Sequence, residues 1–337
     1  MVDELDLLRD MRDVEPVQPR AYEEARAVLR SAMAAPEAPT RRVRWGTRRK
    51  VGVGAAALIA ASAATALVVT STSSSRPLTT PAPAAAAANP ILTKLVAEIS
   101  PMQPEASGDA TLTVRNLSPT SDKVTDFGID LYTDDGTYYW GNDSSALRRA
   151  LTRNGGDNGY KRGIGVALYA VKGDLGTARA RMAVANFPLG TDIEAAQRAG
   201  ERTKIEKLKA AAKARGEKYV PPKPLTAEQK KAITDNHIWS NAIDVLIAAP
   251  KNPQVRAGVL RIMATMPKVK VVKTTTAGQP TLTLTDTWAA VGTEKLVINA
   301  NTGQPVALTS STSDVPDRTM YYHTTRVTLA DIMSGKS

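Results

Sequence analysis

Residues Val51–Val69, with the sequence VGVGAAALIAASAATALVV, are the stretch that decides how the chain is organised. The stretch carries no charged residue, and as a helix it would be roughly 28 Å long, close to the bilayer hydrocarbon thickness of about 30 Å. Its Val, Leu and Ile side chains favour insertion by roughly 2 to 4 kcal/mol in total. The stretch therefore predicts one transmembrane helix of modest hydrophobicity. An Ala-rich helix buried in a soluble protein is the alternative.

The two flanks of this stretch differ sharply in charge. The residues before it read TRRVRWGTRRK, whereas TSTSSSRPLTTPAPAAAAANP after it holds a single Arg. Because Lys and Arg beside a span stay in the cytoplasm, the N-terminus is predicted to lie inside the cell and the C-terminal part outside it. The residues that determine this topology are Arg41, Arg42, Arg44, Arg48, Arg49 and Lys50. An uncleaved anchor is favoured over a signal peptide, whose apolar core would be shorter and nearer the N-terminus.

Residues 1–50 are predicted to form a cytoplasmic tail with two short amphipathic helices. Such a tail is too small to bury a core of its own. Its apolar faces are therefore expected either to bind a cytoplasmic partner or to stay loosely ordered. The candidate partner face consists of Leu5, Leu8, Met11, Tyr22, Val28, Leu29 and Met33.

The chain after the predicted span divides into a linker and one large domain. Residues 70–88 are rich in Ser, Thr, Pro and Ala without a period, which predicts a disordered linker. Residues 89–337 are long enough for a single extracytoplasmic domain. Within this domain, residues 191–224 are mostly charged and poor in large apolar side chains, which indicates a solvated helical excursion.

The period of the outer domain changes along the chain. Helical patterns occupy 90–100, 174–186, 191–219, 227–249 and 252–266, and alternating strand patterns occupy 111–117 and 127–140. From Lys268 onward the period is two, with strands predicted at 269–275, 281–288, 294–299, 306–311 and 321–327. The short turns between these strands permit only antiparallel neighbours. The predicted fold class is therefore α+β, a curved antiparallel sheet covered by helices.

The composition restricts the chemistry that this chain can perform. It has no Cys, two His, 4% aromatic residues and a net charge of +11. Disulfides, thiolate zinc sites and iron–sulfur clusters are excluded, and sugar-stacking or base-stacking clefts are disfavoured. The basic cluster beside the span is better explained by orientation and anionic lipid than by nucleic acid.

A search for catalytic motifs gives no nucleophile, metal or nucleotide signature. The run NGGDNGYKRGIG at 154–165 lacks a G-K-[ST] ending and is predicted to be a loop, and the acidic residues between 122 and 135 lack a calcium-loop register. His237 is predicted to be a structural helix residue and His323 a ladder residue of the last strand. We therefore expect no enzyme activity and no catalytic, cofactor-binding or metal-binding residues.

Segments at both ends of the chain resemble a family of actinobacterial single-pass membrane proteins. The similar segments are MVDELDLLRDMRD, RAYEEARAVLRSAM and RRVRWGTRRK near the N-terminus, and RAGVLRIMATMPKVKVV, TLTLTD, LVINANTGQPVAL and YYHTTRVTL near the C-terminus. Such proteins are often encoded beside extracytoplasmic-function sigma factors, and the resemblance is poor over 191–224. It implies an outer domain similar to lipoprotein-carrier and sigma-regulator half-barrels, and hence a binding function. The zinc-ligand motif of zinc-dependent anti-sigma factors is missing.

Two functional hypotheses follow. In the first, the outer domain binds an envelope lipid, peptide or protein, and the inner tail transmits this state to a cytoplasmic sigma factor. In the second, the chain is a membrane-tethered lipid or peptide carrier or scaffold, and its tail only fixes orientation. Both place the chain in the cell membrane, in contact with the lipid bilayer and without a direct nucleic-acid partner.

Overall fold

The computed structural model describes residues 88–104, 107–125, 127–288, 292–312 and 315–336. The predicted tail, span and linker lie outside these residues. Within the described ranges, no helix combines the length and the apolar composition that a membrane crossing requires.

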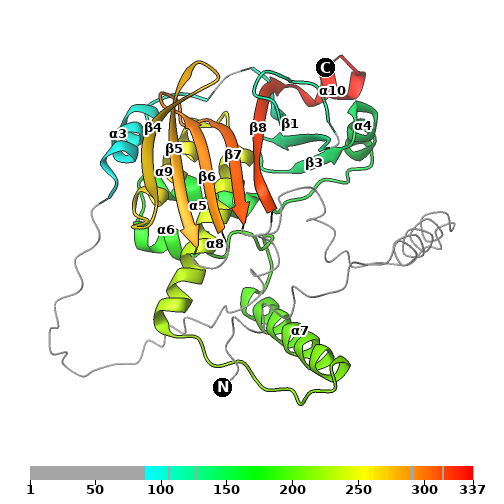
Figure 1. The fold of residues 1–337 in the computed structure, drawn as a ribbon. Helices are drawn as coiled ribbons and strands as arrows, with labels where there is room; N and C mark the ends of the chain where they lie inside the picture. Colours follow the sequence, from blue (N-terminus) through cyan, green and yellow to red (C-terminus); the bar gives the residue numbers. More distant parts are fainter. Residues whose placement is uncertain (1–87, 105–106, 126, 289–291, 313–314, 337) are drawn as a thin grey trace. The chain divides into compact units, whose positions relative to one another are not determined.

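The described domain is built on one open antiparallel sheet, shown in Figure 1. The sheet has eight strands in the order β3-β2-β1-β8-β7-β6-β5-β4, and together with its helices it confirms the α+β class. The strands are β1 (Ala110–Asn116), β2 (Ile129–Thr133), β3 (Tyr138–Gly141), β4 (Lys270–Thr276), β5 (Gln279–Trp288), β6 (Gly292–Asn299), β7 (Pro305–Thr312) and β8 (Val315–Val327).

Strand β8 joins the two halves of the sheet. Its first part pairs with β7 as far as the pair Ala307–Tyr321. Its second part pairs with β1 on the other side, from Tyr321 opposite Asn116 to Val327 opposite Ala110. The meander β4–β8 and the N-terminal strands β1–β3 are therefore offset along β8 and overlap only around Tyr321.

Helices pack on both faces of the sheet. The larger core joins helices α3, α5, α6, α8 and α9 to side chains such as Leu284, Leu296 and Leu308 of β5, β6 and β7. A smaller core places α4 and α10 against Leu131 and the opposite face of β1–β3. The bounds are α3 (Pro90–Ile99), α4 (Ser144–Thr152), α5 (Lys161–Ala170), α6 (Leu175–Met182), α7 (Ile193–Ala214), α8 (Ala227–Ala248), α9 (Pro253–Ala264) and α10 (Leu329–Ser334).

Capping side chains explain where the core helices begin. Thr226 and Gln229 form a reciprocal capping box at the start of α8, and Asn252 accepts backbone hydrogen bonds at the start of α9. Asn89 caps α3 in the same way, just ahead of a proline in the first turn. These local signals agree with the predicted starts of all three helices.

The glycine-rich run departs from its predicted loop conformation. Its second half forms the beginning of α5, and Gly163 is buried there beside Val245 of α8. A Cβ atom at Gly163 would come within 2.3 Å of a Val245 methyl group. The glycines that weaken the helical pattern in the sequence are thus partly explained by close helix packing.

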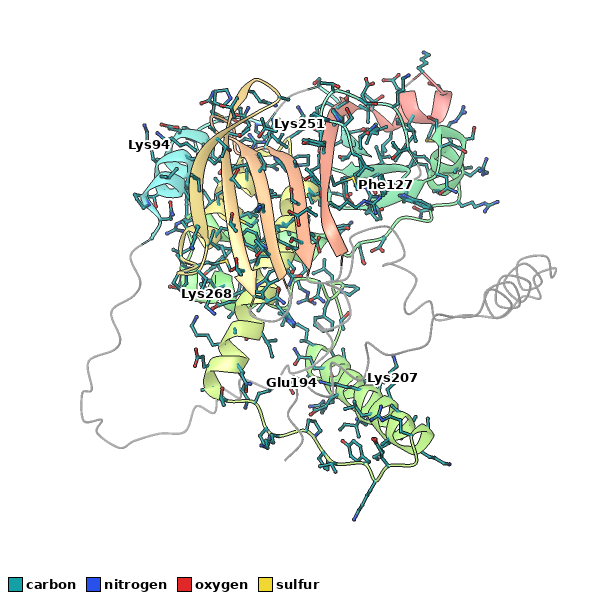
Figure 2. The ribbon with its side chains drawn as sticks, in the orientation of Figure 1. Lys94, Phe127, Glu194, Lys207, Lys251 and Lys268 are labelled. Atoms are coloured by element: carbon teal, nitrogen blue, oxygen red, sulfur yellow. The ribbon has the colours of Figure 1, made fainter. Side chains whose placement is uncertain are left out.

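Helix α7 occupies much of the predicted charged excursion. Its ion pairs are local, such as Arg198 with Glu194 at 3.3 Å and Lys209 with Glu206 at 3.0 Å. The side chains of Glu194 and Lys207 project from this helix in Figure 2. The helix begins at an Asp192 cap, as expected for an exposed helix whose stability is mostly local.

Candidate functional site

The most distinctive feature of the sheet is the opening where β8 leaves β7. Strand β7 starts at Pro305, whose nitrogen carries no hydrogen and cannot donate to a ladder. No β7 residue pairs with β8 beyond Tyr321, although β8 continues to Val327. We call the space beside this stretch of β8 the β8 notch.

The backbone of β8 presents hydrogen-bonding groups toward the β8 notch. The carbonyl of Val327 points to the β1 side, where it accepts from the amide of Asp109 at 3.1 Å. Because the direction of backbone groups alternates along a strand, Tyr322 and Thr324 direct their N–H and C=O groups away from β1. On this side, the β7–β8 ladder ends at the pair Ala307–Tyr321, and no described strand pairs with β8 beyond it.

The β8 notch opens into a small polar cavity of about 160 Å³. This volume holds roughly five water molecules and is below the roughly 300 Å³ at which cofactor-sized pockets begin. Its lining contains no Lys, Arg, Asp or Glu; the lining residues are Pro119, Ala277, Gln279, Asn299, Gln304, Pro305, Val306, Tyr321, Tyr322, His323 and Thr324. The side-chain amide of Asn299 donates to Gln279 at 3.0 Å, which orders one wall.

The two outer edges of the sheet differ from the β8 notch. Strand β4 carries Lys270 and Lys273, and charged side chains of this kind discourage pairing with another chain. Strand β3 is only four residues long, and Tyr138 already pairs with Asp157 in an isolated bridge. The β8 notch differs from both edges because its lining carries no Lys, Arg, Asp or Glu and no isolated bridge closes it.

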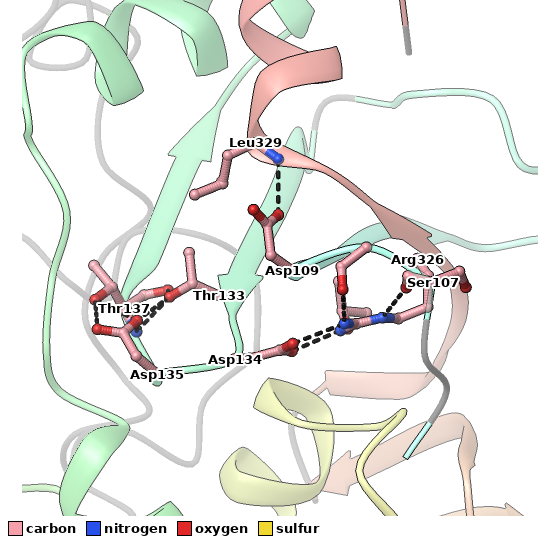
Figure 3. A network of polar contacts seen from close by, with 10 residues as sticks. Ser107, Asp109, Thr133, Asp134, Asp135, Thr137, Arg326 and Leu329 are labelled. Atoms are coloured by element: carbon pink, nitrogen blue, oxygen red, sulfur yellow. Dashed lines mark hydrogen bonds and ion pairs between the residues drawn. The ribbon is translucent and has the colours of Figure 1, made fainter.

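The far end of β8 is held by the polar network in Figure 3. Arg326 forms an ion pair with Asp134 of the β2–β3 turn, at 2.6 Å, and donates to the carbonyl of Ser107 at 2.9 Å. Asp109 accepts from the amide of Leu329 at the start of α10, at 2.8 Å. These bonds fix the course of β8 while contacting none of the notch-lining side chains.

A second polar cluster lies on the face of β1–β3 that is turned away from α4 and α10, and we call it the tyrosine cluster. At its centre the Nε of Arg115 lies 2.7 Å from Asp130 Oδ2, and Tyr138 donates to Asp130 Oδ1 at 2.8 Å. Tyr132 stacks on Tyr138 with ring centroids 5.1 Å apart, and Tyr160 meets both rings edge-on. Burial raises the pKa of Asp130, and Arg115 opposes this effect.

The tyrosine cluster adjoins the β8 notch through Tyr322. Its backbone borders the notch, whereas its ring faces the large core and interacts electrostatically with Arg115. Burial raises the pKa of Tyr138, Tyr160 and Tyr322, so their hydroxyls stay protonated at neutral pH. The carbonyl of Phe127, labelled in Figure 2, accepts from both Arg115 and Trp140 at 3.1 Å and closes the cluster. The cluster provides a rigid polar wall behind β8.

A third group of titratable residues lies on β5 and β6. Glu294 of β6 accepts from Trp239 Nε1 at 2.9 Å and from Ser310 at 3.2 Å, and it stands opposite Asp286 in the register. Burial raises the pKa of both carboxyl groups. The indole of Trp288 binds Asp286, so each acid has its own tryptophan partner. The arrangement joins α8 to the sheet.

The residues singled out in the sequence have mixed outcomes. The cytoplasmic partner face, the topology determinants and the span all lie outside the described residues. His323 lies opposite Val114 in the β1–β8 ladder, which confirms its predicted position. In the described ranges, no three His, Cys, Asp or Glu side chains are arranged to hold a metal ion.

Neither the β8 notch nor the tyrosine cluster is predicted from the sequence. Aromatic residues are scarce over the whole chain, yet Tyr132, Tyr138, Tyr160 and Tyr322 gather around a single Arg–Asp pair. The sequence signal for this cluster was the spacing of Asp130 and Tyr132, which are two residues apart on a strand and therefore share one face. Their partners could be found only from the pairing of β8 with β1.

Comparisons with known proteins do not assign this chain. No protein-family model, curated protein or solved structure matches it. The resemblance to the actinobacterial family, and the half-barrel that it implies, therefore remain predictions.

Proposed function

We propose that this chain is a membrane-anchored extracytoplasmic binding protein with a regulatory role. Residues 89–337 receive an envelope ligand at the β8 notch, and Val51–Val69 hold the domain at the membrane. The N-terminal tail reports the bound state to a cytoplasmic partner, for which the resemblance suggests a sigma factor. The observation that carries the proposal is the polar cavity at the β8 notch.

The composition of the notch supports binding over turnover. Its lining offers one imidazole, on His323, and no carboxylate, amine or thiol that would complete a nucleophile, base and orienting group. The nearest described polar partner of His323 is the carbonyl of Ser118, 3.4 Å away. A carbonyl could position the ring but would not activate a nucleophile.

The same structure bears on the carrier alternative. A lipid carrier needs an apolar cavity, but the large core is filled by side chains such as Leu92, Met263 and Leu284, which are all fully buried. Lipid would have to displace packed helices from the sheet. A peptide carrier or scaffold is therefore the more plausible form of this alternative, and it would use the same notch.

Ligand capture by the full chain tests the binding part of the proposal. A Gln304→Trp substitution places an indole in the cavity, and Gln197→Trp on α7 makes the same change away from it. The three proteins are purified from chemically cross-linked cells, and co-purifying molecules are identified by mass spectrometry. We expect one ligand to be recovered with wild type and Gln197→Trp but lost with Gln304→Trp. Equal recovery with all three proteins would refute the β8 notch as the binding site.

The cytoplasmic tail provides the test of the regulatory part. Leu8→Asp and Leu29→Asp place charges on the candidate partner face, and deletion of residues 2–38 removes this face completely. Regulation predicts that all three changes release a cytoplasmic protein that the wild-type chain retains, and that they alter the cellular response. If the deletion leaves the response intact, the carrier or scaffold hypothesis is favoured.

A further inference from the structure

We propose that helix α7 lies along the surface of an anionic phospholipid bilayer and binds it through one line of basic side chains. The inference goes beyond ligand binding at the β8 notch, and it rests on the anchoring part of the proposed function. It is carried by the exposure of α7, by the spacing of its basic residues and by the distribution of charge along the domain.

Helix α7 contributes to neither core of the described domain. Neither core cluster includes an α7 side chain, and of the 22 residues of the helix only Ala212 is buried. A polar helix of this kind is held by local interactions, such as its Asp192 cap. Its surface is therefore available to a partner without any repacking of the domain.

The basic residues of α7 concentrate on one face. Because an α-helix turns by about 100° per residue, four exposed basic side chains fall within an arc of about 60°. We call this set the α7 stripe; its members are Arg198, Arg202, Lys209 and Lys213. The stripe is about 22 Å long from first to last residue, so its charges can meet a flat surface together.

Acidic neighbours on the helix neutralise the stripe only weakly. Arg198 lies 3.3 Å from Glu194 and Lys209 lies 3.0 Å from Glu206, and all four side chains are at least half exposed. Exposed pairs of this kind contribute little free energy, so both cations can turn to a phosphate at small cost. The other two members, Arg202 and Lys213, form no ion pair with a described residue.

The distribution of charge along the domain favours an anionic partner for this segment. Residues 191–231, which contain α7, hold eleven Lys and Arg against six Asp and Glu, a net charge of +5. Residues 89–190 hold eleven of each sign and have no net charge, and residues 232–337 carry +3 over more than twice the length. The segment around α7 is thus the most cationic part of the outer domain, and we expect it to be attracted to negative surfaces.

The predicted anchor makes lipid the anionic surface within reach. Residues 70–88 can extend over at most roughly 65 Å, so the span at Val51–Val69 would keep α7 at a high effective concentration near the head groups. Nucleic acid is disfavoured as the partner, because α7 has no aromatic side chain on which a base could stack.

The apolar content of α7 indicates how it binds. Its large apolar residues are only Ile193, Ile205 and Leu208, which are too few for an amphipathic helix that buries one face among acyl chains. We therefore expect adsorption at the head groups through charge, which is weakened by salt.

Energy transfer between α7 and the lipid head groups tests the inference in the full chain. Because the protein has no Cys, Ala195→Cys gives a single labelling site on the same face as the α7 stripe. The chain is reconstituted into vesicles of phosphatidylcholine, alone or with about 30% phosphatidylglycerol, that contain a head-group acceptor dye. An impermeant donor dye is then added from outside. We expect transfer to be about twofold more efficient with phosphatidylglycerol, and the rise to disappear at about 0.5 M salt.

Two charge reversals on opposite sides of the helix provide matched variants. Arg202→Glu with Lys213→Glu reverses two charges of the α7 stripe, whereas Lys204→Glu with Lys207→Glu makes the same change in net charge on the other side. We expect the first pair to remove the rise in transfer and the second pair to retain most of it. Neither pair alters a core side chain, so both variants should keep the Tm of the labelled parent.

Several results would overturn the inference. Equal transfer in the two lipid mixtures, a rise that persists at high salt, or an equal loss in both double variants would exclude the α7 stripe as a lipid-binding surface. Inorganic polyphosphate that binds the chain in phosphatidylcholine vesicles, with no effect of phosphatidylglycerol, would assign the stripe to a soluble polyanion instead.

The outcome can be separated from that of the proposed function. If an alkaline carbonate wash extracts the chain, yet phosphatidylglycerol still raises the transfer, the anchor fails and the α7 stripe is supported. If Gln304→Trp abolishes ligand capture while lipid composition has no effect on transfer, the β8 notch is supported and the lipid-binding inference fails.

Discussion

Asp130 is only 2% exposed, and its charge is tolerated there because Arg115 and Tyr138 contact its two oxygens. Breaking a buried pair by removing one partner leaves an uncompensated charge and costs more than replacing both partners. We therefore expect Arg115→Met to destabilise the protein by about 3 to 5 kcal/mol. Chemical denaturation followed by tryptophan fluorescence measures this cost.

The matching double variant isolates the charge effect at the same site. Arg115→Met with Asp130→Leu removes both charges, so we expect it to be more stable than Arg115→Met alone. A double variant as unstable as the single one would show that Arg115 contributes by packing and by its bond to the carbonyl of Phe127.

Glu294 leads to a prediction about pH. Burial raises its pKa, so the folded state favours the protonated carboxyl. That contribution to stability is complete below the ordinary glutamate pKa and is lost as the pH rises through the higher pKa of the folded state. Glu294→Gln should therefore have a higher Tm than wild type at pH 8, and the gain should shrink as the pH is lowered to about 4.5.

Thermal unfolding across this pH range, with Asp286 unchanged in both proteins, measures the effect. If Glu294→Gln is less stable than wild type at every pH, the hydrogen bonds that Trp239 and Ser310 donate to the ionised Glu294 carboxylate outweigh the cost of burying its charge.

At the scale of elements, local patterns located most of the strands and helices. The five predicted strands after Lys268 all exist, and the alternation of apolar and polar residues identified them because one face is buried. The first part of β8, from Val315, was not predicted. Helices α4, α5 and α10 were also missed, since they are short or contain glycine.

Gly258 shows why packing between helices is hard to read from a sequence. A Cβ atom at this position of α9 would lie 1.8 Å from the carbonyl oxygen of Ala167 in α5, so the two backbones approach more closely than an alanine allows. We expect Gly258→Ala to destabilise the protein by about 1 to 3 kcal/mol or more. Gly165→Ala on α5 is the matched control, because nothing lies within 4 Å of its added Cβ.

The control should move stability in the opposite direction. Alanine in a helix interior is favoured over glycine by about 0.5 to 1 kcal/mol, so Gly165→Ala should stabilise slightly. Denaturant midpoints of the three proteins measure both effects. Equal midpoints for Gly258→Ala and wild type would contradict the close contact between α5 and α9.

At the scale of the whole molecule, the sequence predicted the class of the fold but not the site. The pairing of β1 with β8 joins residues more than 200 positions apart, and no local pattern encodes which strand meets which. The β8 notch exists because of this pairing and because β7 begins at Pro305. The amides and tyrosines that surround it are common residues, and their position alone makes them a candidate site.

The predicted span is the feature of the whole chain on which its proposed function depends. Its Val, Leu and Ile side chains favour insertion by only about 2 to 4 kcal/mol, and an arginine near the centre of a span costs about 2.5 to 3.5 kcal/mol. Leu58→Arg with Ala61→Arg should therefore move the chain from the membrane fraction to the soluble fraction, whereas Leu58→Phe with Ala61→Leu should leave it membrane-bound. Fractionation after an alkaline carbonate wash measures this membrane association. A second experiment tests orientation: protease added to intact cells should digest the outer domain of the wild-type chain, because the domain is predicted to lie outside. A wild-type chain that stays soluble, or an outer domain that resists the protease until the cells are lysed, would contradict the anchored topology and remove the route by which the β8 notch could act on a cytoplasmic partner.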